Sequence, residues 1–137
     1  MDGQSDRRIV ATGPMRTIEA AVCLDGSSPA QEFLDQLGET DQQKLTALFA
    51  WMAEHGVIRN EQKFKKLEGA IWEFKSFQIR IPCFQDGRAW VLTHGFIKKK
   101  QKAPRREIER AERIMQEDQQ RQARRRVRRN SHGSDIR

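Results

Sequence analysis

The first patterned segment of the chain alternates apolar and polar residues over residues 17–24, with Ile18, Ala20, Val22 and Leu24 on one parity. A period of two is typical of a β-strand that buries one face. The residues before Met15 show no such period. We therefore expect residues 1–14 to form a disordered N-terminal extension and the folded domain to begin at residue 15.

Two helices are predicted after this strand. Ser28-Pro29 supplies an N-cap and a proline at the first helical position, and this helix is expected to stop at Gly38. The second helix begins after Thr40 and ends at His55-Gly56. Its apolar residues, at spacing i, i+3, i+4 and i+7, form one stripe. The stripe consists of Leu45, Leu48, Phe49 and Met52.

Three strand-like runs follow a basic connector, residues 63–66. They cover residues 70–75, 77–84 and 89–96, and Asp86-Gly87 predicts a tight hairpin between the last two. Pro82 cannot donate a backbone hydrogen bond, which predicts an edge strand or a bulge in the middle run. The last run is apolar on both parities and is expected to be a central strand.

Pro104 opens a last helix, in which Ile108, Ala111, Ile114 and Met115 form a thin apolar face. Beyond Glu117 the stripe is lost, so residues 119–137 are expected to be a basic tail, either a solvated helix extension or disordered. Residues 15–118 are predicted to form an α+β domain. In it, a small antiparallel sheet combines the N-terminal strand with a three-stranded meander, flanked by two N-terminal helices and a C-terminal helix.

The positive charge of the chain is concentrated near its C-terminus. Residues 97–137 contain 15 basic and 6 acidic residues, whereas the first 96 residues contain 11 basic and 13 acidic residues. The whole chain carries a net charge of +7. This distribution favours a partner rich in phosphates, such as nucleic acid, over a tail that only aids solubility.

Cys23 and Cys83 have neither metal-site nor disulfide spacing and are expected to be reduced core thiols. No apolar stretch reaches the length of a signal peptide or membrane span, so a cytoplasmic location is expected.

Known zinc, nucleotide and hydrolase motifs are absent from the sequence, so no metal or cofactor is expected. What remains is a basic face that extends from the lysines of residues 63–66 to those after Phe96. In RNA cleavage the 2′-hydroxyl loses a proton, the 5′-oxygen gains one, and cations stabilise the phosphorane. His94 lies beside these lysines, and Gly95 would allow a backbone to approach closely. The alternative for His94 is a buried, hydrogen-bonded histidine, and Phe96 is either a base-stacking ring or part of the core.

An ordered set of motifs resembles RelE/HigB-type toxins of bacterial toxin–antitoxin systems, most of all their phage-derived HigB-like branch. The set consists of Lys66-Leu67, residues 69–74, 77–81 and 91–99, and a proline-started helix that contains Glu107, Ile108 and Ala111. Its most specific part is the strand end LTHGFIKK, residues 92–99. The resemblance covers roughly residues 17–116.

This resemblance implies a compact sheet flanked by helices and a ribosome-dependent endoribonuclease. Such an enzyme cleaves mRNA through attack of the 2′-hydroxyl, without a metal, and inhibits translation and growth. The implied partners are a helix-turn-helix antitoxin, the ribosome and mRNA. By position, His94, Arg80 and Lys75 would form the catalytic set, with Arg80 on the scissile phosphate and His94 transferring a proton. The resemblance implies that Lys66, Lys98 and Lys99 contact RNA, and Phe96 and Lys100 of the same basic face are the other RNA-binding candidates.

Two features depart from the resemblance. The chain contains no tyrosine, which leaves the general base unassigned, and the arginine-rich tail after Gln120 runs past the usual end of the family.

The alternative function for this chain is a non-catalytic RNA- or DNA-binding module that uses the same basic face. Such a module would bind with strong salt dependence and would leave transcripts uncut.

Overall fold

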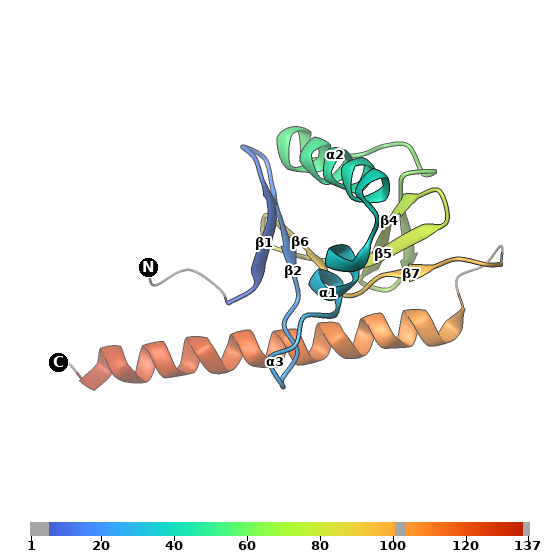
Figure 1. Cartoon of the computed structure of the whole chain (residues 1–137). Helices are drawn as coiled ribbons and strands as arrows, with labels where there is room; N and C mark the ends of the chain where they lie inside the picture. The colour runs from blue at the N-terminus through green and yellow to red at the C-terminus, as the bar shows by residue number, and fades with distance from the viewer. Residues whose placement is uncertain (1–5, 101–103, 136–137) are drawn as a thin grey trace.

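The computed structural model describes residues 6–100 and 104–135, and it confirms the α+β fold with a small sheet and three helices (Figure 1). The first five residues of the expected N-terminal extension, Lys102 and the last two residues of the tail lie outside the described residues. The elements in chain order are β1 (Arg8–Thr12), β2 (Thr17–Ala20), α1 (Pro29–Gln36), α2 (Glu39–His55), β3 (Phe64–Glu68), β4 (Ile71–Ser76), β5 (Ile79–Asp86), β6 (Ala89–Leu92), β7 (Phe96–Ile97) and α3 (Arg105–Asp135).

The strands form one sheet in the order β1-β2-β6-β5-β4-β3, and the short β7 pairs with β5. The expected antiparallel meander is present in β3 to β6. The N-terminal strand β2, however, joins β6 in the parallel direction, so the sheet is mixed rather than antiparallel throughout. Parallel neighbours need a long crossover connection, and the two N-terminal helices lie on the chain between these two strands.

Helices cover both faces of the sheet (Figure 1). On one face, α1 and α2 bury Ala30, Phe49 and Met52 against the apolar side chains of the meander. On the other face, Ala111 and Ile114 of α3 pack against strand residues that include Phe84 and Val91. Alternate residues of a strand point to opposite faces, so β4 and β5 contribute to both cores.

Two segments expected to lack regular structure are strands. The predicted disorder of residues 1–14 is wrong for β1, which pairs with β2 and leads into a loop that contacts the C-terminal part of α2 at Ala53. A Cβ on Gly13 would lie 2.5 Å from the carbonyl carbon of Ala53, so only glycine permits this approach. The basic connector is β3, the edge strand beside β4. Period-two alternation is too short in both segments to be distinguished from a loop.

Pro82 lies in a central strand rather than at an edge, and the register beside it is irregular, since Cys83 pairs with Leu92 but Arg80 with Phe96. The backbone oxygen of Pro82 accepts hydrogen bonds from the backbone N–H and the hydroxyl of Thr93. The N–H and C=O of one strand residue point to the same side. The absent N–H of Pro82 would therefore also face the segment at Thr93. There the predicted single strand of residues 89–96 is interrupted, with β6 ending at Leu92 and β7 beginning at Phe96. The proline therefore sits where the ladder has a gap.

The last helix continues through the expected tail. Of the two alternatives for residues 119–135, the structure shows the helix extension (Figure 1). Arg121 and Gln122 both donate hydrogen bonds to Asp6, which ties this part of α3 to the segment before β1. Residues 123–128 are all exposed. The folded unit therefore extends at least four residues beyond the expected boundary at residue 118.

Cys23 and Cys83 are buried free thiols, as their spacing predicted. Burial raises the pKa of both thiols, which disfavours the reactive thiolate. Among the described residues, no helix is both long and apolar enough to cross a membrane.

Candidate functional site

Strand pairing brings two of the predicted catalytic residues side by side. Lys75 of β4 lies opposite Arg80 of β5, and Arg80 in turn lies opposite Phe96 of β7. Glu73, two residues before Lys75, therefore points to the same face of the sheet. Lys65 of β3 lies opposite Glu73 and completes this arrangement on the edge strand.

Glu73 is the centre of this group. Glu73 is only 4% exposed, and its side-chain Oε1 has no hydrogen-bond partner among the described residues. Burial raises the pKa of the Glu73 carboxyl, although the charges of Arg80, Lys75, Lys98 and Lys65 act in the opposite direction. We call these five residues the Glu73 cluster. A buried carboxylate among cations is a common arrangement at sites of proton transfer.

Arg80 is held rigidly within the Glu73 cluster. One terminal nitrogen of its guanidinium donates hydrogen bonds to the backbone oxygens of Ile79, at 3.0 Å, and Phe77. Its Nε is buried and has no hydrogen-bond partner in the described part of the chain. A guanidinium fixed in this way presents a planar set of donors of the kind that binds phosphate oxygens.

The lysines of the Glu73 cluster form its rim. Lys65 is exposed, whereas Lys75 and Lys98 are half-buried. The Lys75 Nζ donates a hydrogen bond to the backbone oxygen of Glu61, 3.1 Å away. Burial lowers the pKa of Lys75, and the positive charge of Arg80 lowers it further. A lysine with a lowered pKa is a stronger proton donor than a free lysine.

The other predicted RNA-contacting residues are more dispersed. Lys66 lies opposite Trp72, so it points to the face of α1 and α2 rather than to the Glu73 cluster. Phe96 is buried, with 8% of its surface exposed, and stacks on the ring of His94. This placement favours the core alternative for Phe96 over base stacking. Lys99 and Lys100 are exposed and follow the end of β7.

His94 lies in the gap between β6 and β7 and is only 1% exposed. Its Nε2 is 3.0 Å from a carboxylate oxygen of Glu107 on α3, and its Nδ1 is 3.0 Å from the hydroxyl of Thr93. Because a carboxylate only accepts, Nε2 carries a proton and donates it to Glu107. Burial and the charge of Arg110 lower the pKa of His94 to about 4, against the opposing effect of Glu107. This geometry favours the buried, hydrogen-bonded alternative, in which His94 joins the sheet to α3.

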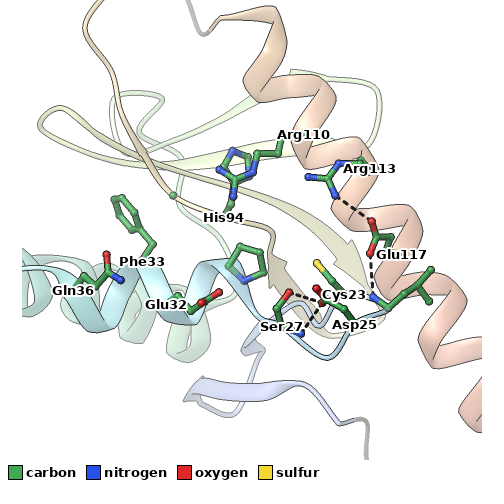
Figure 2. Close-up of a pocket in the computed structure, with 13 residues that line it drawn as sticks. Cys23, Asp25, Ser27, Glu32, Phe33, Gln36, His94, Arg110, Arg113 and Glu117 are labelled. Atoms are coloured by element: carbon green, nitrogen blue, oxygen red, sulfur yellow. Dashed lines mark hydrogen bonds and ion pairs between the residues drawn. The ribbon is translucent and has the colours of Figure 1, made fainter.

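A cavity of about 650 Å³ borders His94 on the side of α1 and α3. Figure 2 shows Arg110 beside the His94 ring, and Arg113 paired with Glu117 at 3.1 Å. No residue of the Glu73 cluster lines this cavity. Gly95 is explained here by packing, since a Cβ would lie 2.2 Å from the ring of Phe33. The close approach that Gly95 permits is therefore to α1.

Sequence reasoning missed Glu73 and chose Lys66 where the structure places Lys65 in the cluster. A signal for Glu73 was present, because a carboxylate in the middle of the apolar run IWEF is costly unless it is used. The choice between Lys65 and Lys66 depends on strand register, which β3 shows only through its pairing with β4. Among the described residues, no three His, Cys, Asp or Glu side chains gather as metal ligands.

Comparison with known proteins gives one family. Residues 32–116, more than half of the chain, match the model of the phage-derived Gp49-like proteins (DUF891). No curated protein matches the chain. The matched segment contains α2, the whole meander and the first part of α3, and so it includes every residue of the Glu73 cluster. The phage-derived relationship expected from the sequence motifs is thereby confirmed at the level of the family, and the chain belongs to the phage-derived Gp49-like proteins.

Proposed function

We propose that this chain is the toxin of a toxin–antitoxin system, an endoribonuclease of the RelE/HigB type that cleaves mRNA on the ribosome. The Gp49-like family consists of toxin-like proteins often found in such systems, which supports the proposal. The observation that carries it is the Glu73 cluster, in which a buried carboxylate lies among Arg80 and three lysines. The partners would be the ribosome, mRNA and a cognate helix-turn-helix antitoxin.

The Glu73 cluster contains the groups that cleavage by a 2′-hydroxyl requires. In the proposed mechanism the Glu73 carboxylate accepts the proton of the 2′-hydroxyl, and the 2′-oxygen attacks the phosphorus. Arg80, with Lys65 and Lys98, stabilises the negative charge of the phosphorane. Lys75 gives a proton to the departing 5′-oxygen, a role that its lowered pKa favours. The products are a 2′,3′-cyclic phosphate and a 5′-hydroxyl.

This mechanism predicts that Glu73→Gln separates activity from stability. Loss of the general base is expected to slow cleavage by about 10²-fold or more. Because burial raises the pKa of Glu73, the folded state binds this proton more tightly than the unfolded state does. The free energy of unfolding is therefore highest below the ordinary pKa of the carboxyl and falls as pH rises through the raised value. Glutamine resembles the protonated form, so the variant should be more stable than the unchanged chain at neutral pH.

Denaturant unfolding at pH 5 and pH 8, together with single-turnover cleavage, would check this prediction. The stability difference between Glu73→Gln and the unchanged chain should increase with pH. Glu54→Gln, at an exposed position of α2, is the matched control and should change neither property. A Glu73→Gln chain that cleaves RNA at the normal rate would exclude Glu73 as the base.

The exposed end of α3 offers a surface for the ribosome. Arg124, Arg125, Arg126 and Arg128 are all exposed, and they follow the last contacts of α3 with Asp6. A basic helix that protrudes from the fold is suited to contact the phosphates of ribosomal RNA. This assignment would make the arginine-rich tail a binding element rather than an aid to solubility.

Removal of residues 124–137 is expected to weaken ribosome binding and to leave the fold intact. The slope of log affinity against log salt should become shallower by about one unit for each phosphate that the tail neutralises. Sedimentation with ribosomes at several salt concentrations measures both the affinity and the slope. A chain with lysine at the four arginine positions keeps the charge and should keep the slope. An unchanged slope after truncation would show that the tail is only solvated.

A further inference from the structure

A second surface meets the Glu73 cluster at Lys75 and lies on the α2 side of the sheet. It is a groove of about 880 Å³ between α2, the segment that follows α2, and the turn that joins β4 to β5. Leu48 and Ile58 contribute apolar surface to its lining, and Trp51 and Phe77 contribute aromatic rings. The proposed catalytic roles use none of these four residues.

Phe77 occupies an unusual position in this groove. Phe77 is 75% exposed. Its backbone has a φ of 55°, in the left-handed region that non-glycine residues rarely adopt. For a residue with a Cβ this conformation is less favourable than a right-handed one. An exposed aromatic side chain on a strained turn contributes little to the stability of the chain alone. Strain of this kind is common at ligand-binding positions.

Trp51 supplies a second exposed ring to the groove. It lies on α2, is 55% exposed and contacts the ring of His55, with 4.0 Å between ring centroids. Lys44, about two helical turns before it, holds its Nζ 4.1 Å from the centroid of the Phe77 ring. The groove therefore combines two accessible aromatic faces with a cation close to one of them.

The charges around the groove have one sign. Lys44, Arg59, Lys63 and Lys75 line it, and none of its described lining residues is acidic. Aromatic faces beside a row of cations are the features that bind single-stranded nucleic acid, because bases stack on the rings and phosphates pair with the cations. A helical or extended peptide would use the apolar floor but would leave these cations without partners unless it were acidic.

Lys75 connects the groove to the Glu73 cluster. It lines the groove, and it also lies opposite Arg80 in the pairing of β4 with β5. The groove lies on the α2 side of the sheet and the Glu73 cluster on the α3 side, so an RNA strand with its scissile phosphate at Arg80 would pass around the turn between β4 and β5, by Lys75, to reach the groove. This continuity favours RNA over a separate protein partner as the occupant.

We propose that this groove binds the single-stranded nucleotides that flank the scissile phosphate, with bases stacked on Phe77 and Trp51 and phosphates on Lys44 and Lys63. The inference rests on the proposed function, because it assumes that RNA is held at Arg80. It adds a subsite for bases, and therefore a place where sequence preference would arise. Stacking is tolerant of base identity, so the expected preference is modest.

The test measures binding separately from cleavage. The full chain, unchanged or with one substitution, is titrated against a fluorescein-labelled 2′-O-methyl oligoadenylate of about ten nucleotides, a length within the site sizes of single-strand binders. The blocked 2′-oxygen prevents cleavage. Phe77→Ala is expected to weaken binding about 5- to 100-fold, the usual effect of losing one stacking ring, whereas Phe77→Tyr, which keeps the ring, should bind as the unchanged chain does. Trp51→Ala with Trp51→Phe forms a second pair, and Lys44→Ala should make the salt slope shallower by about 0.7.

The outcomes distinguish the two proposals. Weaker binding with both alanine variants and normal binding with both aromatic variants supports the groove as an RNA subsite. Equal affinities for Phe77→Ala and the unchanged chain, or no binding by the unchanged chain, overturn the inference. A Phe77→Ala chain that binds the oligonucleotide normally but no longer binds the antitoxin also overturns it and assigns the groove to protein docking. None of these results affects the proposed function, which depends on cleaved mRNA ends and on the Glu73 cluster.

Discussion

Replacing Arg80 by alanine is expected to slow mRNA cleavage by about 10²- to 10³-fold, the usual effect of deleting one fixed donor from the site that stabilises a developing oxyanion. The guanidinium is buried, is held by the backbone oxygens of Phe77 and Ile79, and lies opposite Lys75. Lysine at this position keeps the charge but loses the planar, forked donors, so Arg80→Lys should recover only part of the rate. Single-turnover cleavage of ribosome-bound mRNA measures the effect.

Two controls make the Arg80 result specific. Arg8→Ala removes an exposed arginine from β1, at the edge of the sheet opposite to β3, and should leave the rate unchanged. Thermal unfolding of Arg80→Ala should show a cooperative transition, because the change affects the packing of one turn and leaves both hydrophobic cores intact. A folded Arg80→Ala chain that cleaves mRNA at the normal rate would remove the Glu73 cluster from consideration as the active site.

The largest effect on stability is expected from Asp118→Ala. The Asp118 side chain is fully buried and accepts hydrogen bonds from Arg7 at 2.6 and 3.1 Å and from the backbone N–H of Val22 at 3.0 Å. Arg7 is itself buried, and it also pairs with Asp86 at 2.9 Å. Removal of one partner leaves a buried guanidinium with less compensating charge, which typically costs about 3–5 kcal/mol.

Denaturant unfolding would measure this loss of stability directly. Glu109→Ala, at an exposed position of the same helix, is the matched control and should change the free energy of unfolding by less than about 0.5 kcal/mol. Arg7→Ala should be destabilising as well, and the double variant should be destabilised by less than the sum of the two, because the residues share one network. A loss below about 1 kcal/mol for Asp118→Ala would contradict the role of this network as the link between β1 and α3.

This network also explains why the ends of the domain were hard to predict from the sequence. Arg7 and Asp118 are 111 residues apart, and each lies in a segment that is polar along the chain. A local pattern contains no information on a contact of this kind, so residues 1–14 were expected to be disordered and residue 118 to end the domain. The structure shows instead a strand at one end and a continuous helix at the other.

Elements with strong local signals were predictable. The apolar stripe of α2, the proline at the first position of α1 and the Asp86-Gly87 hairpin all correspond to features of the structure. Strand direction was not predictable, because the parallel pairing of β2 with β6 depends on how the chain crosses the sheet. The gap at Thr93 was hidden as well, since apolar residues continue on both sides of it.

The candidate site was predictable in part. Lys75 and Arg80 were chosen from motifs, and strand pairing places them side by side. His94 was chosen because a histidine near lysines is chemically suited to proton transfer, but the fold buries it against Glu107. The local pattern does not place Glu73 in the site, because its neighbours Arg80 and the lysines come from other parts of the chain and meet it only through strand pairing.

The chemistry of the fragment ends tests the central claim most directly. Purified chain would be incubated with translating ribosomes and a defined mRNA, and the ends of the resulting fragments would be identified. Attack by the 2′-hydroxyl predicts 5′-hydroxyl and 2′,3′-cyclic phosphate ends that form only with ribosomes present and disappear with Arg80→Ala and Glu73→Gln. Fragments with 5′-phosphate ends, or an intact mRNA to which the chain nevertheless binds, would contradict the account.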